Sequence, residues 1–331
     1  MDYISPTEFA KVHNANRLYE LLEAAGMSGP GWEKREPLAT EPKKNFLPAH
    51  WKYSIAKAAL DAVGKIVSNE IADRRTLRLF NQVPGNTYAT LRTLRCAYQM
   101  VLPGESARSH RHTANALRLV MESSSGNHTV VNGKRIPMLP GDVVLTPNWS
   151  WHGHHNESTG CAYWIDFLDT PAAHYFGSMF FEALPGGGIE GSDQVEERSP
   201  MRFPFSEISH RLDAQSADRA GLKSMELGPP TLDTIALHVW RLDAGQSIAR
   251  GRTTANTIFA VIDGEGTSFV DGAEFQWGCG DVIAVPAWHE CRHKAHSQSH
   301  LLRVTDEPLL RRLNWLRNSD VGDSLQTSPS E

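Results

Sequence analysis

Residues 104–120 read GESARSHRHTANALRLV, and residues 245–261 read GQSIARGRTTANTIFAV, which is a second copy of the same pattern. A further segment is repeated in the same order: GDVVLTPNW over 141–149 and GDVIAVPAW over 280–288. The offset between the copies is close to 140 residues in both cases. Similarity at a constant offset is the signature of a duplicated structural unit. The sequence therefore predicts two copies of one domain.

The duplicated unit has the composition of a β domain. From Arg75 onward, short apolar and β-branched runs alternate with Gly, Pro and Asn, as in a sandwich or barrel. Asn132-Gly133 separates the runs HTVV and KRI, and this dipeptide is the strongest short hairpin signal available. The second copy has Asp271-Gly272 at the matching place. We therefore expect a mainly β fold with paired hairpins.

Helices are predicted on both sides of the repeats. Ser5-Pro6-Thr7-Glu8 combines an N-cap serine, a proline at the first helical position and a glutamate three residues after the cap. Leucines at helical spacing follow, and Ala24-Ala25-Gly26 predicts the end of this helix. A second helix is expected from Trp51 to about Val67, and a basic, leucine-bearing one over 307–316.

These patterns divide the chain into five segments. A helical segment over 1–74 precedes the first β unit, which occupies 75–184. A connector rich in Pro and Gly over 185–228 leads to the second unit, 229–306. A helix and a polar tail over 307–331 close the chain.

Composition excludes several classes of partner. The 331 residues are 40% hydrophobic and 21% charged, which is typical of a globular protein. The formal net charge of −5 comes without a long charged block, so neither nucleic acid nor a membrane surface is the expected partner. No stretch approaches the roughly 18 apolar residues of a membrane span. The four cysteines form no CxxC pair, so reduced thiols and a cytoplasmic location are expected.

Two histidines of the first copy have the spacing of ligands to one metal ion, and a third lies further along the chain. His110 and His112 are separated by one residue, so on a strand both imidazoles point to the same face. His152 follows the second repeated segment. Three imidazoles suit zinc or iron, and the ligand type alone does not decide between them. Three other histidines lack such support and are expected to be structural or solvent-facing: His128, His155 and His174.

The spacing of both segments resembles that of the cupin superfamily. Five residues separate Gly104 from His110, and five separate Gly141 from Pro147. The resemblance implies a bicupin, with N-terminal helices and two double-stranded β-helix (jelly-roll) barrels, and with the three histidines converging inside the first barrel. Cupins usually add a glutamate after the second histidine, whereas residues 115–117 are Asn-Ala-Leu. Three imidazoles would leave open positions for substrate and oxygen.

The second copy lacks the ligand set of the first. Gly251 and Thr253 stand where the first copy has its pair of histidines. His289 and His293 remain near the position of the third histidine, but an isolated imidazole pair is a poor metal site. The second cupin is therefore expected to hold no metal and to serve packing or assembly. One catalytic centre per chain follows.

A narrower resemblance covers nearly the whole chain. Several segments resemble the gentisate 1,2-dioxygenase family, which includes salicylate and 1-hydroxy-2-naphthoate dioxygenases. The segments are PAHWKY (48–53), QMVLPGESARSHRH (99–112), TANALRLVMES (113–123), VVLTPNWSWHGHHNE (143–157) and YWIDFLDTP (163–171). The resemblance implies iron(II) on three histidines and O2 as a co-substrate. It also implies cleavage between the carboxyl- and hydroxyl-bearing carbons of a small aromatic acid, and a homotetramer.

The resemblance also assigns roles to individual side chains. Arg118 matches an arginine whose cationic fork would bind the substrate carboxylate. Gln99 and His154 match positions that contact substrate oxygen groups, and His154 could also exchange the phenolic proton. Arg74 or Arg75 is expected to give a further carboxylate contact.

Four more positions complete the expected site. Asp166 and Asp169 fall in a tryptophan–aspartate segment and could orient ligands through hydrogen bonds, a structural role being favoured over direct catalysis. Many relatives have a tryptophan where this chain has Arg95, and Ala97 would lie on the same side of its strand and shape the pocket. An extra cation there favours a substrate with an additional electron-withdrawing or anionic substituent, so a substituted salicylate, such as 5-nitrosalicylate, is a candidate beside gentisate and salicylate.

Two other functions remain open at the level of sequence. One is a zinc-dependent cupin isomerase or hydrolase, which metal analysis and O2 dependence would separate from a dioxygenase. The other is a bicupin without catalytic activity that binds a small ligand. The three histidines beside Arg118 argue against the latter, since such a cluster has no evident structural use.

Overall fold

The computed structural model describes residues 4–28, 40–72, 74–191 and 194–319. The chain divides into two compact units, residues 1–43 and 44–331. The polar tail that the sequence predicts after the last helix lies mostly outside the described residues. The limits of the five predicted segments stay a prediction.

The smaller unit contains two helices, α1 (Pro6–Ala10) and α2 (Ala15–Ala24). Ser5 caps α1, and its amide donates to the Glu8 carboxylate over 2.9 Å, as the capping box predicts. The predicted helix is interrupted, however, because Asn14 starts a new one. Its side-chain oxygen accepts a hydrogen bond from the Arg17 amide over 2.9 Å, which favours a second N-terminus over continuation.

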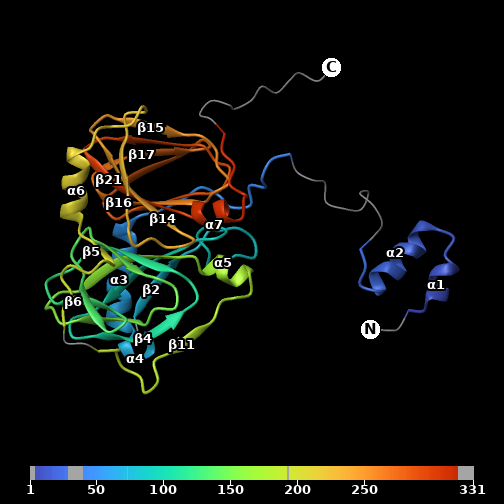
Figure 1. Ribbon diagram of the computed structural model, residues 1–331, viewed down its shortest axis with the longest axis horizontal. Coiled ribbons are helices and arrows are strands. Elements are labelled where there is room, and N and C mark those ends of the chain that lie inside the picture. The colour runs from blue at the N-terminus through green and yellow to red at the C-terminus, as the bar shows by residue number, and fades with distance from the viewer. Residues whose placement is uncertain (1–3, 29–39, 73, 192–193, 320–331) are drawn as a thin grey trace. The chain divides into compact units, whose positions relative to one another are not determined.

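The larger unit consists of two barrels of antiparallel strands (Figure 1). The first barrel, cupin 1, has a six-stranded sheet in the order β12-β8-β5-β10-β3-β2 and a five-stranded sheet in the order β11-β4-β9-β6-β7. Its strands are β2 (Arg75–Leu79), β3 (Arg95–Val101), β4 (Ser106–His112), β5 (Ala116–Glu122), β6 (Asn127–Val131), β7 (Lys134–Pro137), β8 (Val143–Thr146), β9 (His152–Asn156), β10 (Ala162–Leu168), β11 (Phe181–Ala183) and β12 (Arg202–Phe203).

The second barrel, cupin 2, repeats this plan. A six-stranded sheet in the order β1-β19-β16-β21-β14-β13 faces a four-stranded sheet in the order β15-β20-β17-β18. Its strands are β1 (Ala49–Trp51), β13 (Lys223–Glu226), β14 (Ala236–Leu242), β15 (Ser247–Arg250), β16 (Thr257–Asp263), β17 (Glu265–Val270), β18 (Ala273–Gly278), β19 (Val282–Val285), β20 (Cys291–Ala295) and β21 (Ser299–Thr305). The predicted mainly β bicupin fold is confirmed.

Both predicted hairpins form at the expected residues. Asn132 and Gly133 connect β6 to β7 with φ of 47° and 77°, and Asp271 and Gly272 connect β17 to β18 with φ of 43° and 87°. Two successive residues with positive φ define the tight turn that matches the twist of paired strands. The Asn-Gly and Asp-Gly signals therefore identified the same element of each cupin.

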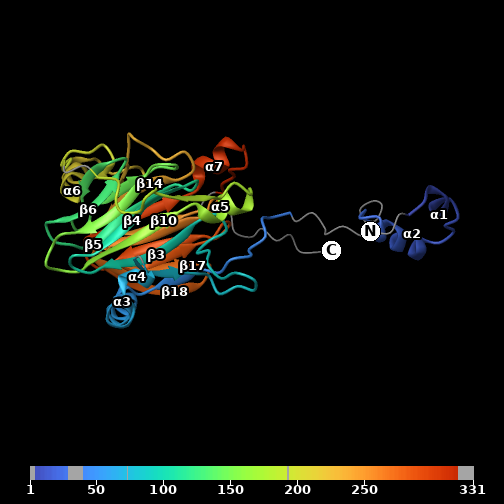
Figure 2. The same cartoon turned by 90° about the horizontal axis from the view of Figure 1, so that it is seen from below.

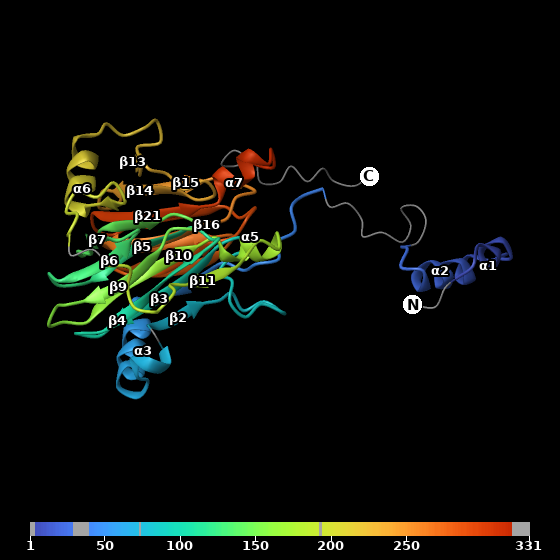
Figure 3. The same cartoon turned by 60° about the horizontal axis from the view of Figure 1, so that its bottom comes forward.

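The core of the larger unit lies between the two six-stranded sheets. In β5, Leu117 and Leu119 belong to this core together with Ile258 of β16 and Leu302 of β21, and all four are fully buried. Alternate residues of β5 face the opposite way, into the barrel of cupin 1. Each strand of this sheet therefore supplies one face to the contact between cupins and the other face to the barrel interior. Figure 3 shows the two sheets stacked.

Two equivalent polar clusters connect the cupins. Asn115 donates to Asp169 over 3.3 Å and to Thr234 over 2.9 Å, and the Thr234 hydroxyl also contacts that carboxylate. In the second copy, Asn256 donates to Asp306 over 2.9 Å and to Thr93 over 3.1 Å, and Thr93 contacts Asp306. Thr234 of cupin 2 contacts Asp169 of cupin 1, and Thr93 of cupin 1 contacts Asp306 of cupin 2. The duplication therefore produces a reciprocal pair of ties.

Residues 49–66 span both cupins. β1 pairs with β19 of cupin 2, and helix α3 (Tyr53–Ile66) packs against β2 and β3 of cupin 1 (Figure 2). The Tyr53 amide donates to Asp281 over 2.8 Å, whereas its hydroxyl donates to Glu122 over 2.9 Å. The predicted helix thus begins two residues later than expected, because Ala49–Trp51 completes a sheet.

Four short helices lie between or after the strands: α4 (Asn69–Ala72), α5 (Thr170–Tyr175), α6 (Phe205–Ala214) and α7 (Glu307–Arg312). The last is shorter than the predicted 307–316 helix, and Asn314 just beyond it adopts a positive φ of 56°. None of the helices formed by the described residues has the length and apolar character needed to cross a bilayer.

The reciprocal ties give a matched test of the fold. Thr93→Val and Thr234→Val each remove a donor from a buried carboxylate, so each should lower the free energy of unfolding by about 1–3 kcal/mol in urea denaturation. The exposed hydrogen bond of Thr113 to the Ser178 carbonyl provides a control, and Thr113→Val should change stability by only about 0.5 kcal/mol. Losses no larger than that control would contradict the structural role of the ties.

Candidate metal centre

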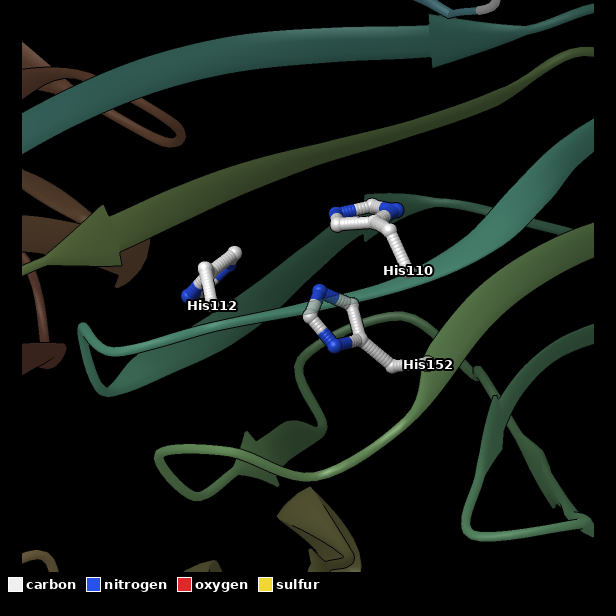
Figure 4. A group of neighbouring side chains, drawn as sticks. All are labelled: His110, His112 and His152. Atoms are coloured by element: carbon white, nitrogen blue, oxygen red, sulfur yellow. The ribbon is translucent and has the colours of Figure 1, made fainter. Parts of the chain in front are cut away.

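Three buried histidines converge inside cupin 1 (Figure 4). His110 and His112 lie on β4, and His152 is the first residue of β9, which pairs with β4. One ligand nitrogen from each lies within 4.8 Å of the others. The ring centroids of His110 and His152 are 4.3 Å apart, and those of His112 and His152 are 4.9 Å apart. The structure thus brings together the three predicted ligands.

Each of these imidazoles is fixed by a backbone carbonyl two residues away. Nδ1 of His110 lies 3.0 Å from the Arg108 carbonyl oxygen, Nδ1 of His112 lies 2.8 Å from that of Ala114, and Nδ1 of His152 lies 2.9 Å from that of Ser150. A carbonyl only accepts, so Nδ1 carries the proton in each ring. Nε2 is left with its lone pair, which is the arrangement that metal-binding histidines adopt. The donor set therefore fits a divalent transition metal.

The protein environment keeps these imidazoles neutral. Burial, reinforced by the nearby Arg74, lowers the pKa of His110 to about 3, and burial lowers the pKa of His112 to about 4. Burial also places the pKa of His152 well below its usual value. Only the neutral form of imidazole offers a lone pair to a metal, so all three residues are in the ligating form at neutral pH.

A close approach of two strands sets the geometry of the cluster. The register between β4 and β9 shifts between Ala107 and His110, so the strand bulges just before the first ligand. Gly153 lies between His152 and the next inward residue, and a Cβ there would come within 2.8 Å of the Ser109 Oγ atom. A glycine is required at this position because a side chain would push β9 away from β4.

A buried ion pair lies on the opposite sheet of the barrel. Arg118 of β5 and Asp166 of β10 are direct cross-strand partners, and Arg118 Nε lies 3.3 Å from Asp166 Oδ1. Arg118 Nη1 donates to the Thr146 hydroxyl over 2.5 Å and to that of Thr129 over 3.4 Å. Gln99 Nε2 donates to the other oxygen of Asp166. Asp166 therefore holds both predicted substrate-binding groups in place.

The two supporting threonines were not identified from the sequence. Thr146 ends a strand whose other buried residues are apolar, whereas Thr129 lies on a strand that also buries Asn127 and His128. Strand pairing places Thr129 on the same inward face as His154, and Thr146 on the same inward face as Arg118. The sequence alone does not give this register, so the two threonines could not be assigned to the site from it.

Several buried polar atoms beside the histidines have no partner among the described residues. Both ring nitrogens of His154 are buried without a hydrogen bond, as are Gln99 Oε1 and Trp164 Nε1. The ring of His154 lies 4.8 Å from that of Trp164. Burial, with a further contribution from Arg118, places the pKa of His154 well below its usual value. Buried polar groups in native proteins are almost always satisfied, so these atoms indicate a site that takes a polar ligand.

The sequence left Arg74 and Arg75 as alternatives for a contact with the substrate carboxylate, and the structure places these two side chains differently. Arg74 Nη2 lies 3.2 Å from His110 Nε2, whereas Arg75 turns away and contacts Glu105 and the Val67 carbonyl. The structure thus brings Arg74, but not Arg75, to the histidines.

Asp166 and Asp169 differ in the same way. Asp166 contacts Arg118 and Gln99 within the site, but Asp169 belongs to the tie with Thr234. The equivalent tie recurs in cupin 2, so it serves the fold.

A pocket of about 440 Å³ opens beside the predicted specificity residues. Arg74, Arg78, Arg95 and Gln99 are among its lining residues. Ala97 lies between Arg95 and Gln99 on β3 and is the direct partner of Arg78 on β2. Arg78 was not identified from the sequence, because only the pairing of β2 with β3 places it there.

The barrel of cupin 2 is filled where that of cupin 1 is polar. By the repeat, Phe259 replaces Arg118 and Trp240 replaces Gln99, and both belong to the apolar core of cupin 2. The offset of the second repeated segment aligns His293 with His154 and Cys291 with His152. His293 is fully buried, and its Nδ1 lies 2.7 Å from the Ser268 hydroxyl.

The remaining histidines lie apart from the cluster. Nδ1 of His289 is 3.0 Å from the Ala287 carbonyl, and Nε2 of His155 is 3.1 Å from Glu157. His128 is buried on β6, and His174 lies on α5 with its ring 5.7 Å from that of Tyr88.

Comparisons with known proteins agree with this geometry. The cupin domain family matches residues 97–168. The chain is 32% identical to a 5-aminosalicylate 1,2-dioxygenase of Comamonas sp., over 91% of this chain and 88% of that protein. It is 30% identical to gentisate 1,2 dioxygenase 1 of Aquipseudomonas alcaligenes, over 91% and 95% of the two chains.

A solved structure shows the same fold over nearly the full length. The salicylate 1,2-dioxygenase of Pseudaminobacter salicylatoxidans has a TM-score of 0.84 and 26% identity, covering 92% of this chain and 96% of that one. Since relatives of at least 30% identity extend over most of the sequence and the bicupin architecture is shared, the chain belongs to the family of gentisate and salicylate 1,2-dioxygenases, which are ring-cleaving oxidoreductases.

Proposed function

We propose that this protein is an iron(II)-dependent dioxygenase that inserts both atoms of O2 between the carboxyl-bearing and hydroxyl-bearing carbons of a 2-hydroxybenzoate. The observation that carries the proposal is the cluster of three neutral histidines beside buried, unsatisfied polar atoms of Gln99 and His154. A metal and a polar aromatic acid would satisfy both sets of atoms.

His110, His112 and His152 would hold the iron through Nε2, because each Nδ1 is engaged by a carbonyl. When bound, iron(II) supplies redox chemistry toward O2 and open coordination positions for an aromatic acid. Zinc has no redox chemistry, so the dioxygenase activity named for the relatives favours iron over zinc here.

Arg118 is the group that we assign to the substrate carboxylate. It is buried, and Asp166, Thr129 and Thr146 fix its orientation. These partners engage Nη1 and Nε, so Nη2 is the nitrogen that would donate charge-assisted hydrogen bonds to the carboxylate and thereby position the ring. Arg74, which lies 3.2 Å from His110 Nε2, would add a second cation beside the same carboxylate.

Gln99 and His154 are assigned to the substrate oxygens. The Gln99 amide nitrogen is held by Asp166, while His154 presents two free ring nitrogens in a dry environment. A neutral imidazole can hold the phenolic hydroxyl through a hydrogen bond, whereas burial, which lowers the pKa of His154, makes it a weak acceptor of the phenolic proton. Ala97, a small residue between these groups and Arg95, leaves room for a ring substituent. We therefore propose gentisate, salicylate and substituted salicylates such as 5-nitrosalicylate as candidate substrates.

We further propose that the protein works in the cytoplasm as a homotetramer. All four cysteines are free, and a reducing compartment keeps them so. Cupin 2, with its apolar barrel, would serve packing and assembly.

Metal content tests the ligand assignment. His112→Ala removes one of three ligands and should abolish stoichiometric iron binding in anaerobically loaded protein, measured by elemental analysis. His155→Ala is the matched control, because His155 lies on the same strand as His152 but contacts Ser106 and Glu157 instead. The wild-type chain should bind one iron. Full iron retention by His112→Ala would overturn the assignment.

Oxygen uptake tests the reaction. Iron-loaded protein is offered gentisate, salicylate, 5-nitrosalicylate and 1-hydroxy-2-naphthoate in turn, and consumption of one O2 per molecule is expected with at least one of them. Uptake should disappear in His112→Ala. Bound iron without uptake on any of the four would contradict the proposed substrate class.

Arg118→Lys tests recognition of the carboxylate. Lysine keeps the positive charge near Asp166 but loses the fork, so kcat/KM should fall by at least about tenfold, or 1.4 kcal/mol, with iron content unchanged. Arg135→Lys provides a control on the outer surface, where Arg135 pairs with Glu157 over 2.8 Å. Equal kinetics for wild type and Arg118→Lys would refute the role of the fork.

A further inference from the structure

Two arginines lie side by side at the edge of the barrel of cupin 1. Arg78 of β2 pairs directly with Ala97 of β3, and Arg95 is two residues before Ala97 on the same strand. Because side chains alternate along a strand, Arg78, Arg95 and Gln99 all project from the same face of the sheet. Both arginines line the 440 Å³ pocket together with Gln99.

These cations have no ion-pair partner among the described residues, although the charge of Asp166 partly offsets that of Arg95. Neither Arg78 nor Arg95 forms an ion pair within the part of the chain that the structure describes, and Arg95 Nε is buried without a hydrogen bond. Burial and the neighbouring Arg78 lower the pKa of Arg95. Among the described lining residues of the pocket there is no carboxylate. Arg95 is half-buried and Arg78 is exposed, so the cost of an unpaired charge falls mainly on Arg95, and an anion in the pocket would lower it.

The nearest carboxylate is already committed. Asp166 accepts hydrogen bonds from Gln99 and pairs with Arg118 at 3.3 Å. Arg75, another lining residue, is neutralised by Glu105. The duplication adds a comparison within the chain: the residue of cupin 2 that matches Arg95 is Ala236. The charge of Arg95 therefore has no counterpart at the matching position of cupin 2.

We propose that Arg78 and Arg95 form a second anion-binding subsite, so that the preferred substrate is a 2-hydroxybenzoate carrying an additional anionic group on its ring. This inference rests on the proposed function, since Arg118 would take the first carboxylate and the ring would extend past Ala97 toward the pocket. A guanidinium pair binds a carboxylate or sulfonate through charge-assisted hydrogen bonds.

The chemistry of recognition distinguishes this substrate class from neutral substituents. A nitro, amino or hydroxyl group carries no full charge and leaves both guanidinium groups uncompensated, whereas a second carboxylate neutralises them. Discrimination by a charged site exceeds that by an apolar pocket, because the wrong ligand leaves the half-buried charge of Arg95 unpaired. The subsite therefore acts on selectivity more than on the ring-opening step.

The test compares substrates that differ only in this charge. The probes are 4-hydroxyisophthalate and 2-hydroxyterephthalate, which are salicylates with a second carboxylate, and the corresponding monoamides in which that carboxylate is a neutral carboxamide. Dissociation constants are measured by calorimetry on iron-loaded protein under nitrogen, and kcat/KM is measured by oxygen uptake. The variants are Arg95→Gln, Arg78→Gln and the conservative Arg95→Lys.

Wild type should prefer at least one dicarboxylate over its amide by at least about tenfold in both measurements, equivalent to 1.4 kcal/mol. Arg95→Gln and Arg78→Gln should remove most of this preference, because they weaken binding of the dicarboxylate more than that of the amide, while Arg95→Lys should retain part of it. No preference for either isomer, or an equal loss on acid and amide, would overturn the subsite. Anaerobic binding that shows the preference without any oxygen uptake would instead refute the ring-cleavage proposal and leave the subsite standing.

Discussion

The burial of one sheet of each cupin against the other is the constraint on which the rest of the structure depends. Leu117 and Leu119 of β5 pack into the core between the cupins, and this fixes the face that the strand turns away from its own barrel. Because strand side chains alternate, Arg118 must then point into the barrel, opposite the histidines. A shift of the strand by one residue would bury the guanidinium in an apolar core, which is prohibitively costly. The packing that stabilises the bicupin therefore also fixes the position of Arg118 inside the barrel.

The two cupins show how one scaffold supports a site in one copy and a core in the other. The ties through Asn115 and Asn256 are retained in both copies, so they maintain the fold. The inward positions diverge: Phe259 and Trp240 fill the space that Arg118 and Gln99 leave polar in cupin 1. A filled barrel contributes stability, while an unfilled polar barrel needs a ligand to satisfy its buried groups. Cupin 1 therefore retains a polar ligand site, whereas cupin 2 contributes a packed apolar core.

The charge distribution of the site suits an acidic aromatic ligand. Burial keeps the histidines neutral, so the positive charge comes from the surrounding arginines, of which Arg118 is balanced by Asp166. Arg78 and Arg95 are not balanced by any described carboxylate within ion-pair distance, and they lie at the pocket that reaches Gln99. A field of one sign in a low-dielectric cleft attracts anions and raises their local concentration. The same field would hold a dianionic ligand more firmly than a monoanionic one.

The sequence by itself determined both hairpins and the pairing of His110 with His112, because these depend on short-range spacing: an Asn-Gly or Asp-Gly turn, or two residues on one face of a strand. The duplicated β architecture followed from the internal repeat, and the convergence of His152 with the other two histidines followed from the resemblance to cupins. It did not separate Arg74 from Arg75 or Asp166 from Asp169, and it missed Arg78. These distinctions depend on strand pairing between residues far apart in the chain, and a register is fixed only when the whole sheet packs. The tertiary structure also decided that residues 49–51 complete a sheet of cupin 2, since edge pairing with β19 satisfies backbone groups that local sequence leaves unassigned.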